Sequence, residues 1–424
     1  MKTNQITLVI ALLFCLSAIT TNDSAAQVLD YTEYKGTVVD NNTNDPLESV
    51  GIKLSKTNLG SITNDEGVFT IKVPNDRGID AIVFSLLGYE SKRIPLEELS
   101  SGTNRIRLTP VVTELSQINI STFKSAKALV RVVLDKKKEN NMKQAAVMTA
   151  FYRETIKKRN RNVSLTEAVV NLYKQPYTSA QKDNVGLHKA RKSTDYRRLD
   201  TVALKLQGGP YSTLYLDIMK YPEYIFTPIM IDEYDFSFGQ PTTVNDKPVF
   251  VVNFKQKEDI DVPRYYGSLF IDSESLALSS AIYSLNLADM KGQANKMFVK
   301  KKPRDIDVTP LRASYRVDYR EKEGQWYYGY GKVDLSFKVK KRGKLFNSVY
   351  TLSSEMAVTD WEVNTTKERL RNRERLKPTV IMSDEVSGFK DPDFWGPYNL
   401  IEPEKSIESA INKIRRKLRR DDRS

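Results

Sequence analysis

Residues 34–73, YKGTVVDNNTNDPLESVGIKLSKTNLGSITNDEGVFTIKV, decide how the first part of this chain folds. Short segments that alternate apolar and polar residues are separated by runs rich in Asn, Asp, Pro and Gly. A period of two indicates strands with one buried face, and the runs between them indicate turns. Further segments follow, so that strands are predicted at residues 35–39, 50–54, 68–73, 81–86, 89–95 and 105–108. Short strands at this spacing predict a sandwich of about seven strands.

The apolar and turn positions of this stretch have distinct predicted roles. Asp65 can accept backbone N–H groups in an Asx-type turn, and Gly67 can take a positive φ before the strand that carries Phe69. We interpret these three residues as structural, because the acidic residues of the turns lack the regular ligand spacing of a calcium loop. The core is expected to be filled by apolar residues of two strands, Val50, Ile52, Leu54, Phe69 and Ile71.

Several motifs in residues 34–108 occur together in one known family. They are Gly36-x-Val38-x-Asp40, Asp45-Pro46-Leu47, the alternating residues at 50–54, G-S-x-T-N-x-x-G-x-F at 60–69 and Leu87-Gly88-Tyr89. Together they resemble the carboxypeptidase regulatory-like domain, over less than a fifth of the chain. The resemblance implies a transthyretin-like β-sandwich that serves as an interaction or accessory module. The family takes its name from a neighbouring metallocarboxypeptidase, and the module itself carries no peptidase chemistry.

Two segments follow the predicted sandwich. Residues 115–121, LSQINIS, form a short alternating strand that resembles the link between this module and the plug of TonB-dependent outer-membrane receptors. Too little chain remains for the large barrel of such a receptor. Residues 125–141 predict a packing helix, because Ser125 can cap it and Leu129, Val132 and Val133 form an apolar stripe.

Residues 1–26 have the three parts of a secretory signal: a positive charge at Lys2, an apolar run at 6–19 and small residues at 24–26. We predict cleavage before Gln27 and an exported protein, periplasmic or associated with an outer membrane. An N-terminal membrane anchor is the alternative, but the apolar run is short for a spanning helix of about 20 residues. Cys15, the only cysteine, would leave with the signal, so the mature chain would hold no disulfide.

The chain has one histidine, His188, within the polar segment NVGLHKARKS at 184–193, where we expect an exposed loop. Common zinc hydrolases need two or three imidazoles, and a Ser-His-Asp or Cys-His site needs one well-placed base. Metallocarboxypeptidase activity is therefore rejected on chemical grounds. We predict a protein that is not an enzyme, and we assign no catalytic residue, cofactor or metal ligand.

Strand-like segments recur between residues 144 and 363 and predict a larger antiparallel β domain. Among them are the segments at 146–157, 165–173, 249–255, 267–272, 277–287, 311–319, 326–340 and 344–358. GSLFIDSESLALSSAIYSL, at 267–285, resembles the meander of lipoprotein-sorting carriers, in which a curved sheet half-encloses an apolar groove. The domain could be such a half-barrel, a sandwich or a small membrane barrel.

Residues 204–238 are rich in aromatic side chains and are broken by Pro222 and Pro228. Such rings can stack on sugars or line a lipid groove, but they can equally pack in a core. The rings considered as ligand contacts are Tyr211, Tyr215, Tyr221, Tyr224 and Phe226.

Acidic residues offer the alternative function of a carboxylate-dependent envelope hydrolase. Glu154 with Glu167, or a pair drawn from Asp232, Glu233 and Asp235, could act as two catalytic carboxylates. Charged residues make up 28% of the chain, so chance pairs are frequent and only their separation in space could support this reading.

The last part of the chain, residues 364–424, predicts a wrapped segment around Trp395 followed by a basic amphipathic helix. That helix could pack on the β domain, or it could lie on an anionic membrane surface or bind a partner through Arg415, Arg416, Lys417, Arg419 and Arg420. The net charge of +13 is spread through many clusters, and an exported protein rarely meets nucleic acid, so no nucleic-acid partner is predicted.

The sequence as a whole predicts a mainly β protein with a sandwich at 27–113, a linker strand and helix at 114–143, an antiparallel β domain at 144–363 and a tail at 364–424. Its expected function is that of a non-enzymatic envelope protein that binds a lipid-like or glycan-like ligand or a partner protein. The alternatives are a carboxylate-dependent hydrolase and a small outer-membrane barrel or an accessory of outer-membrane assembly or transport.

Overall fold

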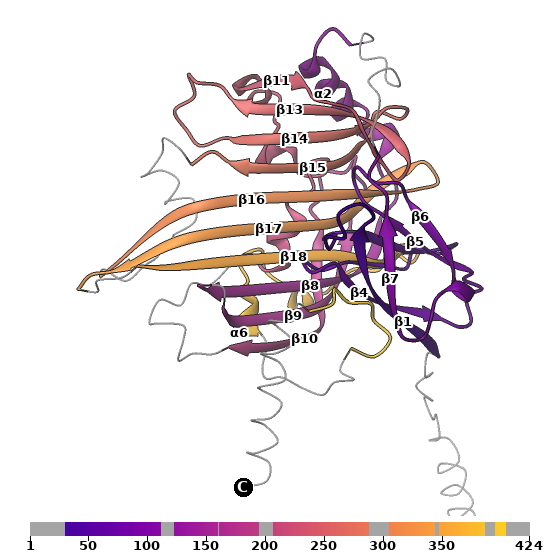
Figure 1. Cartoon of the computed structure of the whole chain (residues 1–424). Helices are drawn as coiled ribbons and strands as arrows, with labels where there is room; N and C mark the ends of the chain where they lie inside the picture. Colours follow the sequence, from indigo (N-terminus) through magenta and orange to yellow (C-terminus); the bar gives the residue numbers. More distant parts are fainter. Residues whose placement is uncertain are drawn as a thin grey trace, which may run out of the picture.

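The computed structural model describes residues 30–111, 123–159, 161–194, 207–287, 305–343, 347–385 and 395–403. The predicted signal, the linker strand at 115–121 and the basic C-terminal helix lie outside these ranges. Within them the chain is mainly β, as predicted, and builds an N-terminal sandwich and one large antiparallel sheet (Figure 1).

The N-terminal sandwich has the predicted seven strands, arranged in two sheets. One sheet has the order β4 (Val68–Pro74), β1 (Tyr31–Asp40) and β7 (Thr103–Leu108), with β1 and β7 parallel. The other has the order β3 (Gly60–Ile62), β2 (Gly51–Leu54), β5 (Ala81–Ser85) and β6 (Lys92–Pro95), and β6 leads into the short helix η1 (Leu96–Glu98). Strand β3, only three residues long, was not among the predicted strands.

The predicted sandwich core is confirmed, because all five expected side chains are at most 1% exposed. Phe69 meets Phe84 edge to face, with ring centroids 5.2 Å apart. Full burial of one such side chain contributes about 1.5–3 kcal/mol. The alternating pattern of the sequence therefore reports the packing that holds the two sheets together.

The turn before β4 has the backbone that the sequence predicts and a different capping side chain. Gly67 has φ +70°, and a Cβ atom at this position would lie 2.6 Å from the Val38 carbonyl oxygen. The N–H groups of Glu66 and Val68 both donate to Asn64 Oδ1 at 2.9 Å, one residue before the predicted acceptor Asp65. Asp65 Oδ1 instead accepts a 2.8 Å bond from Lys332 of the large sheet.

Two of the family motifs meet each other in the folded sandwich. Asp40 Oδ1 accepts the N–H groups of Asn42 and Thr43 at 2.7 and 2.8 Å, and its Oδ2 accepts the Tyr89 hydroxyl at 2.9 Å. The bond donated by Thr43 is the largest of the effects that lower the pKa of Asp40. The Gly-x-Val-x-Asp and Leu-Gly-Tyr motifs are therefore parts of one turn-closing contact.

Within the described ranges the large sheet has eleven strands, and its outermost strands are β10 and β11. All of its strand pairs are antiparallel. Its order is β10 (Asn184–Thr194), β9 (Arg161–Lys174), β8 (Ala146–Lys158), β18 (Ser348–Val363), β17 (Gln325–Lys341), β16 (Ile306–Lys322), β15 (Leu278–Leu285), β14 (Tyr265–Asp272), β13 (Lys247–Gln256) and β11 (Tyr234–Phe238), and β12 (Thr242–Val244) pairs with β13.

One face of the large sheet, the inner face, is covered by the helical segments. The predicted helix forms as α2 (Ala126–Asp135), and the Ala128 N–H donates to Ser125 Oγ at 3.1 Å, so Ser125 caps it as expected. Helix α2 packs near β11, and α4 (Pro210–Leu214) packs on β17 and β18. The other short helices within the described ranges are α3 (Lys137–Asn140), η4 (Pro222–Tyr224), η5 (Met230–Glu233), η6 (Asn372–Glu374) and α6 (Met382–Glu385).

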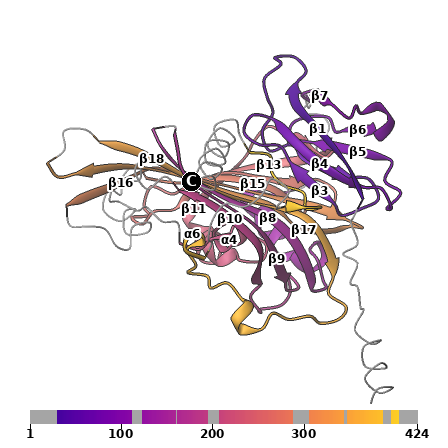
Figure 2. The ribbon, with the colours of Figure 1, turned by 90° about the horizontal axis from the view of Figure 1, so that it is seen from below.

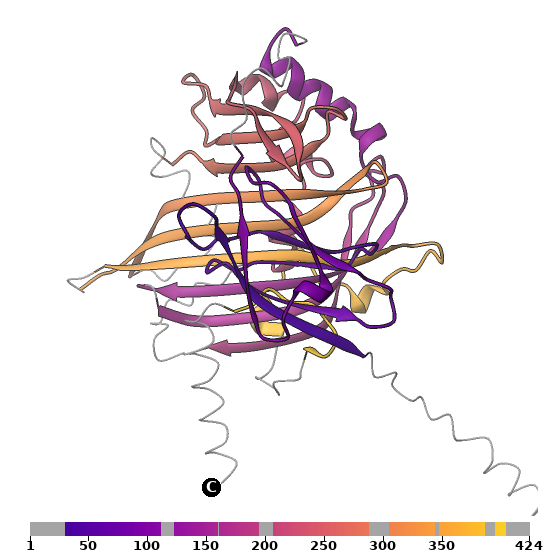
Figure 3. The same cartoon turned by 45° about the vertical axis from the view of Figure 1, so that its right-hand side comes forward.

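The opposite face, the outer face, carries the sandwich and the tail segment at 395–403. Figure 2 shows the sandwich on one side of the large sheet and α4 and α6 on the other. In Figure 3 the sandwich lies across β16–β18, and the end of these strands projects away from it. Backbone atoms join the two parts as well, since the Gly88 N–H donates to the Thr243 carbonyl at 2.8 Å.

The segment around His188 is a strand, β10, and not a loop as predicted. It pairs with β9 and has a bulge between Leu187 and Lys189, which leaves His188 exposed, as expected. The ring lies beside Tyr398 of the tail, with Nε2 2.8 Å from the tyrosine hydroxyl. Polar residues on both faces hid this edge strand, because one face meets the tail and the other lies near α6.

Candidate functional site

The two carboxylates that could have formed a hydrolase pair lie on opposite faces of the large sheet. Glu154 stands opposite Thr166 in the strand register, and Glu167 stands opposite Arg153. Neighbouring residues of a strand point to opposite faces, so the sheet separates Glu154 from Glu167. Asp232 is paired with Lys127, and Glu233 with Arg264. The described structure therefore gives the first pair no common cleft and commits two members of the second group to ion pairs.

Glu154 is buried on the inner face among hydroxyl groups. Its Oε2 accepts a 3.0 Å hydrogen bond from the Tyr152 hydroxyl. Ser354 stands opposite Glu154 in the strand register, and its Oγ lies 3.2 Å from the Oγ of Ser212 on α4. Burial raises the pKa of Glu154 to about 7, and the charge of Asp384 adds to the rise. The hydroxyl of Thr166, on the neighbouring strand, is buried without a partner in the described structure.

Charged side chains form a row across six strands of the outer face. We call this set the charge row, and in spatial order from β16 to β10 it consists of Arg316, Lys332, Glu355, Arg153, Glu167 and Arg191. Arg153 lies 2.8 Å from Glu167 and 3.4 Å from Glu355, while Arg191 donates to Glu167 at 2.6 Å. Burial alone would raise the pKa of Glu167, but Arg153 and Arg191 lower it.

The sandwich and the tail cover this charge row. Lys332 lies 2.8 Å from Asp65 of the sandwich turn, and the Arg153 guanidinium donates to the main-chain carbonyls of Ile401 and Glu402. Trp395 packs over the Arg191 guanidinium, 4.9 Å from ring centroid to Cζ. Buried charges are tolerated only when they are paired, so the row fixes where the sandwich and the tail can sit.

The aromatic segment was predicted either to contact a ligand or to pack in a core, and most of its five singled-out rings pack in the core. Tyr211, Tyr221 and Phe226 are at most 3% exposed and belong to the core of the large sheet. Tyr224 is 45% exposed and stacks on the half-buried Tyr215, with centroids 5.2 Å apart. The apolar inner face is therefore covered by the chain's own residues, and of the five predicted rings only Tyr215 and Tyr224 reach the surface.

A second ionic cluster holds this segment in place. Lys174 of β9 is fully buried and lies 2.7 Å from Asp183 and 2.8 Å from Asp217, which precedes η4. Tyr177 and Tyr319 donate to Asp217 at 2.9 and 3.1 Å. Every charge in the cluster has a partner, and the two carboxylates outweigh the desolvation of Lys174, so that its pKa is raised. The cluster is a structural anchor.

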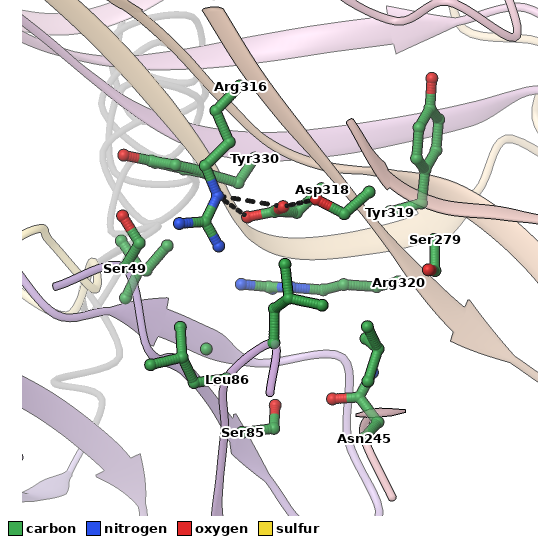
Figure 4. A pocket seen from close by; sticks show the side chains of 15 residues that line it. Ser49, Ser85, Leu86, Asn245, Ser279, Arg316, Asp318, Tyr319, Arg320 and Tyr330 are labelled. Carbon is green, nitrogen blue, oxygen red and sulfur yellow. Dashed lines mark hydrogen bonds and ion pairs between the residues drawn. The ribbon is translucent and has the colours of Figure 1, made fainter. Parts of the chain in front are cut away.

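A pocket of about 70 Å³ lies at the junction of the sandwich and the large sheet (Figure 4). We call it the junction pocket. The sandwich contributes Ser49, Ser85 and Leu86, and β16 contributes three charged residues, Arg316, Asp318 and Arg320. Tyr330 links the pocket to the charge row, because its hydroxyl donates to Glu355 at 3.1 Å. No periodicity in the sequence could reveal this site, because its sandwich residues lie more than 200 positions before those of β16.

Basic residues gather at the end of the sheet that projects away from the sandwich. The β8–β9 turn and the end of β17 flank the start of β18, since the Arg159 N–H donates to the Val349 carbonyl at 3.1 Å and Val349 stands opposite Lys338. We call this set the basic end; it consists of Lys157, Lys158, Arg159, Arg161, Lys338, Lys340, Lys341 and Arg342. Asp305 and Asp307 are the acidic residues beside it.

The described residues place limits on other kinds of site. None of them gather into a group of three or more His, Cys, Asp and Glu side chains that could hold a metal ion. No helix among them combines the length and the apolar character needed to cross a membrane. The basic residues at 415–420, predicted as membrane or partner contacts, lie outside the described ranges.

Comparison with known proteins supports the reading of the first domain. Residues 34–120 match the CarboxypepD_reg-like domain family, and nothing in the match indicates a peptidase domain. No curated protein matches the chain. The sandwich is therefore a carboxypeptidase regulatory-like domain, as its motifs predicted.

Two solved structures show a distant likeness. A DUF1329 family protein from Desulfovibrio piger ATCC 29098 has 9% identity and a TM-score of 0.24, and the match covers 58% of this chain and 96% of that one. A LolA superfamily protein from Nitrosomonas europaea has 7% identity and a TM-score of 0.19, with 61% of this chain and 100% of that one covered. Likenesses at these TM-scores do not define a shared fold.

Proposed function

We propose that this chain is a non-enzymatic adaptor of the cell envelope. In this proposal the protein is exported, the basic end attaches it to an anionic membrane surface, and the sandwich offers a binding surface to a partner protein at the opposite end. The observation that carries the proposal is the basic end, where eight of the described cations lie around the start of β18 with two carboxylates, one of them 3.6 Å from Lys341.

Geometry supports attachment through this end. Val349, 41% exposed, sits between the Arg159 backbone and Lys338, so an apolar side chain lies among cations. Such a combination suits the headgroup layer of a membrane, where each Lys or Arg near an anionic surface contributes about 1 kcal/mol. Figure 1 shows the sandwich at the other end of β16–β18, so membrane and partner would not compete for one surface.

The proposal assigns no enzyme site because the buried acidic groups form ion pairs or lie on separate faces of the sheet. Glu167 and Glu355 are bound to Arg153, and Asp183 and Asp217 are bound to Lys174. Glu154 is buried beneath α4 and separated by the sheet from Glu167. These carboxylates hold the fold together, and hydrolysis would need two of them in one open cleft.

Vesicle co-sedimentation of residues 27–424 tests the attachment. We expect binding to vesicles of equal parts phosphatidylglycerol and phosphatidylcholine and loss of binding on pure phosphatidylcholine. The Lys338→Glu/Lys340→Glu double variant should bind at least about 30-fold more weakly, because two cations worth about 1 kcal/mol each are lost. The matched control is Lys92→Glu/Arg105→Glu, which makes the same charge change on exposed positions of the sandwich and should bind like the wild type.

Two results would contradict the proposal. One is binding that is equal on the neutral vesicles. The other is a double variant that binds normally while removal of residues 404–424 abolishes binding, which would assign the membrane contact to the C-terminal segment. Circular dichroism of each variant confirms that the loss is not one of folding.

A further inference from the structure

The junction pocket contains more positive charge than its own residues neutralise. Its charged lining residues are Arg316, Asp318 and Arg320, all on β16, which leaves an excess of one positive charge. Residues two apart on a strand share a face, so the three side chains point from β16 toward the sandwich. An excess charge that is half-buried between two domains costs free energy unless an anion joins it.

Arg316 uses only part of its guanidinium inside the protein. Its Nε lies 2.9 Å from Asp318 Oδ2 and 3.1 Å from Oδ1, and Ser280 donates to the same carboxylate at 2.6 Å. In the described part of the chain no hydrogen-bond acceptor is found for either Nη atom. Figure 4 shows these two nitrogens on the pocket side of the ion pair, above Arg320. A guanidinium held by Nε presents its two Nη donors as a fixed fork.

Arg320 brings a second guanidinium without a carboxylate. Its Nη1 donates to the Val358 carbonyl at 2.9 Å and its Nη2 to the Ser61 carbonyl at 3.4 Å. No ion pair joins it to an acidic residue among those the structure describes. Burial lowers the pKa of Arg320 below its ordinary value, and the nearby Tyr327 and Asp318 offset that effect only in part.

The sandwich supplies the opposite wall of the pocket. Ser85 is half-buried, lines the pocket and has no side-chain hydrogen bond within the described ranges. Ser49 also lines it, while the hydroxyls of Ser279 and Ser280 are already donated to Phe270 and Asp318. The pocket volume of about 70 Å³ is several times the 10–15 Å³ that one water needs. A small group of four or five heavy atoms fits this space.

We infer that the junction pocket binds a tetrahedral oxyanion, either inorganic phosphate or the phosphoryl group of a phosphate ester. A planar carboxylate would be satisfied by one guanidinium fork. Here donors converge from two walls, with guanidinium groups on the sheet and hydroxyls on the sandwich, and a tetrahedral group can accept from both. Because the ligand would touch both domains, its binding would also fasten the sandwich to the sheet.

Isothermal titration of residues 27–424 with inorganic phosphate, glycerol 3-phosphate and acetate at constant ionic strength tests the inference. We expect both phosphates to bind and acetate to bind at least about 10-fold more weakly. The Arg316→Met variant should weaken phosphate binding by at least about 10-fold, since a charged hydrogen-bond donor pair is lost. Arg312→Met, at an exposed cation four residues earlier on β16 and outside the pocket, is the matched control and should bind like the wild type.

The two sources of the phosphoryl group give different results, and both support the site. Tighter binding of glycerol 3-phosphate assigns a phosphate ester such as a lipid headgroup, and equal binding assigns free phosphate. If Arg316→Met does not fold, Ser85→Ala and Arg316→Lys decide, because each keeps the charge of the sheet and removes part of the donor set. The inference is overturned if neither phosphate binds at about 10 mM, a concentration that detects even weak anion sites, or if phosphate binding survives these variants. These soluble ligands do not test the basic end, so the membrane proposal stands or falls separately.

Discussion

Replacing Glu154 by Gln is expected to change how stability depends on pH. Burial raises the pKa of Glu154 from 4.5 to about 7, with a further contribution from Asp384, and the bond from Tyr152 opposes the rise. The folded protein therefore keeps this proton at pH values where the unfolded chain has lost it. The stabilising contribution is fully present below about pH 4.5 and is lost as the pH rises to about 7.

The size of the effect follows from the two pKa values. They differ by about 2.5 units, and each unit is worth about 1.36 kcal/mol, which gives about 3 kcal/mol. Gln is neutral at every pH and keeps an acceptor for the Tyr152 hydroxyl. Relative to the wild type, the free energy of unfolding of Glu154→Gln should rise by about 3 kcal/mol between pH 4.5 and pH 8.

Urea unfolding of residues 27–424 at pH 4.5, 6 and 8, followed by tryptophan fluorescence and circular dichroism, measures this difference. Glu258→Gln, at an exposed position of the same domain, is the matched control and should give the wild-type profile. If the difference between Glu154→Gln and wild type is the same at all three pH values, Glu154 is not a protonated buried acid and our account of the inner face is wrong.

Two further predictions concern stability. Lys174→Met leaves Asp183 and Asp217 buried without a counter-charge, so we expect the free energy of unfolding in urea to fall by about 3–5 kcal/mol. The exposed Lys182→Met should change it very little. A fall below about 1 kcal/mol for Lys174→Met would show that the cluster is not the anchor described here. Gly67→Ala adds a Cβ atom 2.6 Å from the Val38 carbonyl at φ +70°, whereas Gly78→Ala has a similar φ of +59° and meets nothing within 4 Å. The first should cost about 1–3 kcal/mol more than the second, and equal losses would refute the clash.

The sandwich could be predicted from sequence because its signals are local. Val50, Ile52 and Leu54 alternate over a five-residue window, and Gly67 stands beside the strand it introduces. The acceptor of the Asx turn was predicted one residue too late, because Asn64 and Asp65 both carry an oxygen that can accept backbone N–H groups. Only the docking of the sandwich, in which Asp65 meets Lys332, decides between them.

The sites of the large sheet could not be predicted, because register creates them. Arg153 and Glu167 face each other only when β8 and β9 pair as they do, and a shift of one residue between the two strands would place their side chains on opposite faces of the sheet. Strand β10 was not predicted for the same reason, since Arg191 is polar in the sequence but is buried against Glu167 in the structure. Short apolar alternation finds strands, but it is silent about strands whose faces are both polar.

The charge row also narrows where a partner protein could bind. The turn that carries Asp65 contacts β17 and the tail, and strand β3 contacts β18. Neither is available to a partner protein. The three-stranded sheet remains, and its edge strand β7 presents Thr103, Arg105 and Arg107 as exposed side chains. An edge strand with a row of outward cations can pair with an added strand that carries acidic residues, so an acidic extended segment is the kind of partner that this surface would accept. A partner that instead needed β3 would have to break the hydrogen bonds that join Ser61 of this strand to Leu400 of the tail and to Arg320 of the large sheet.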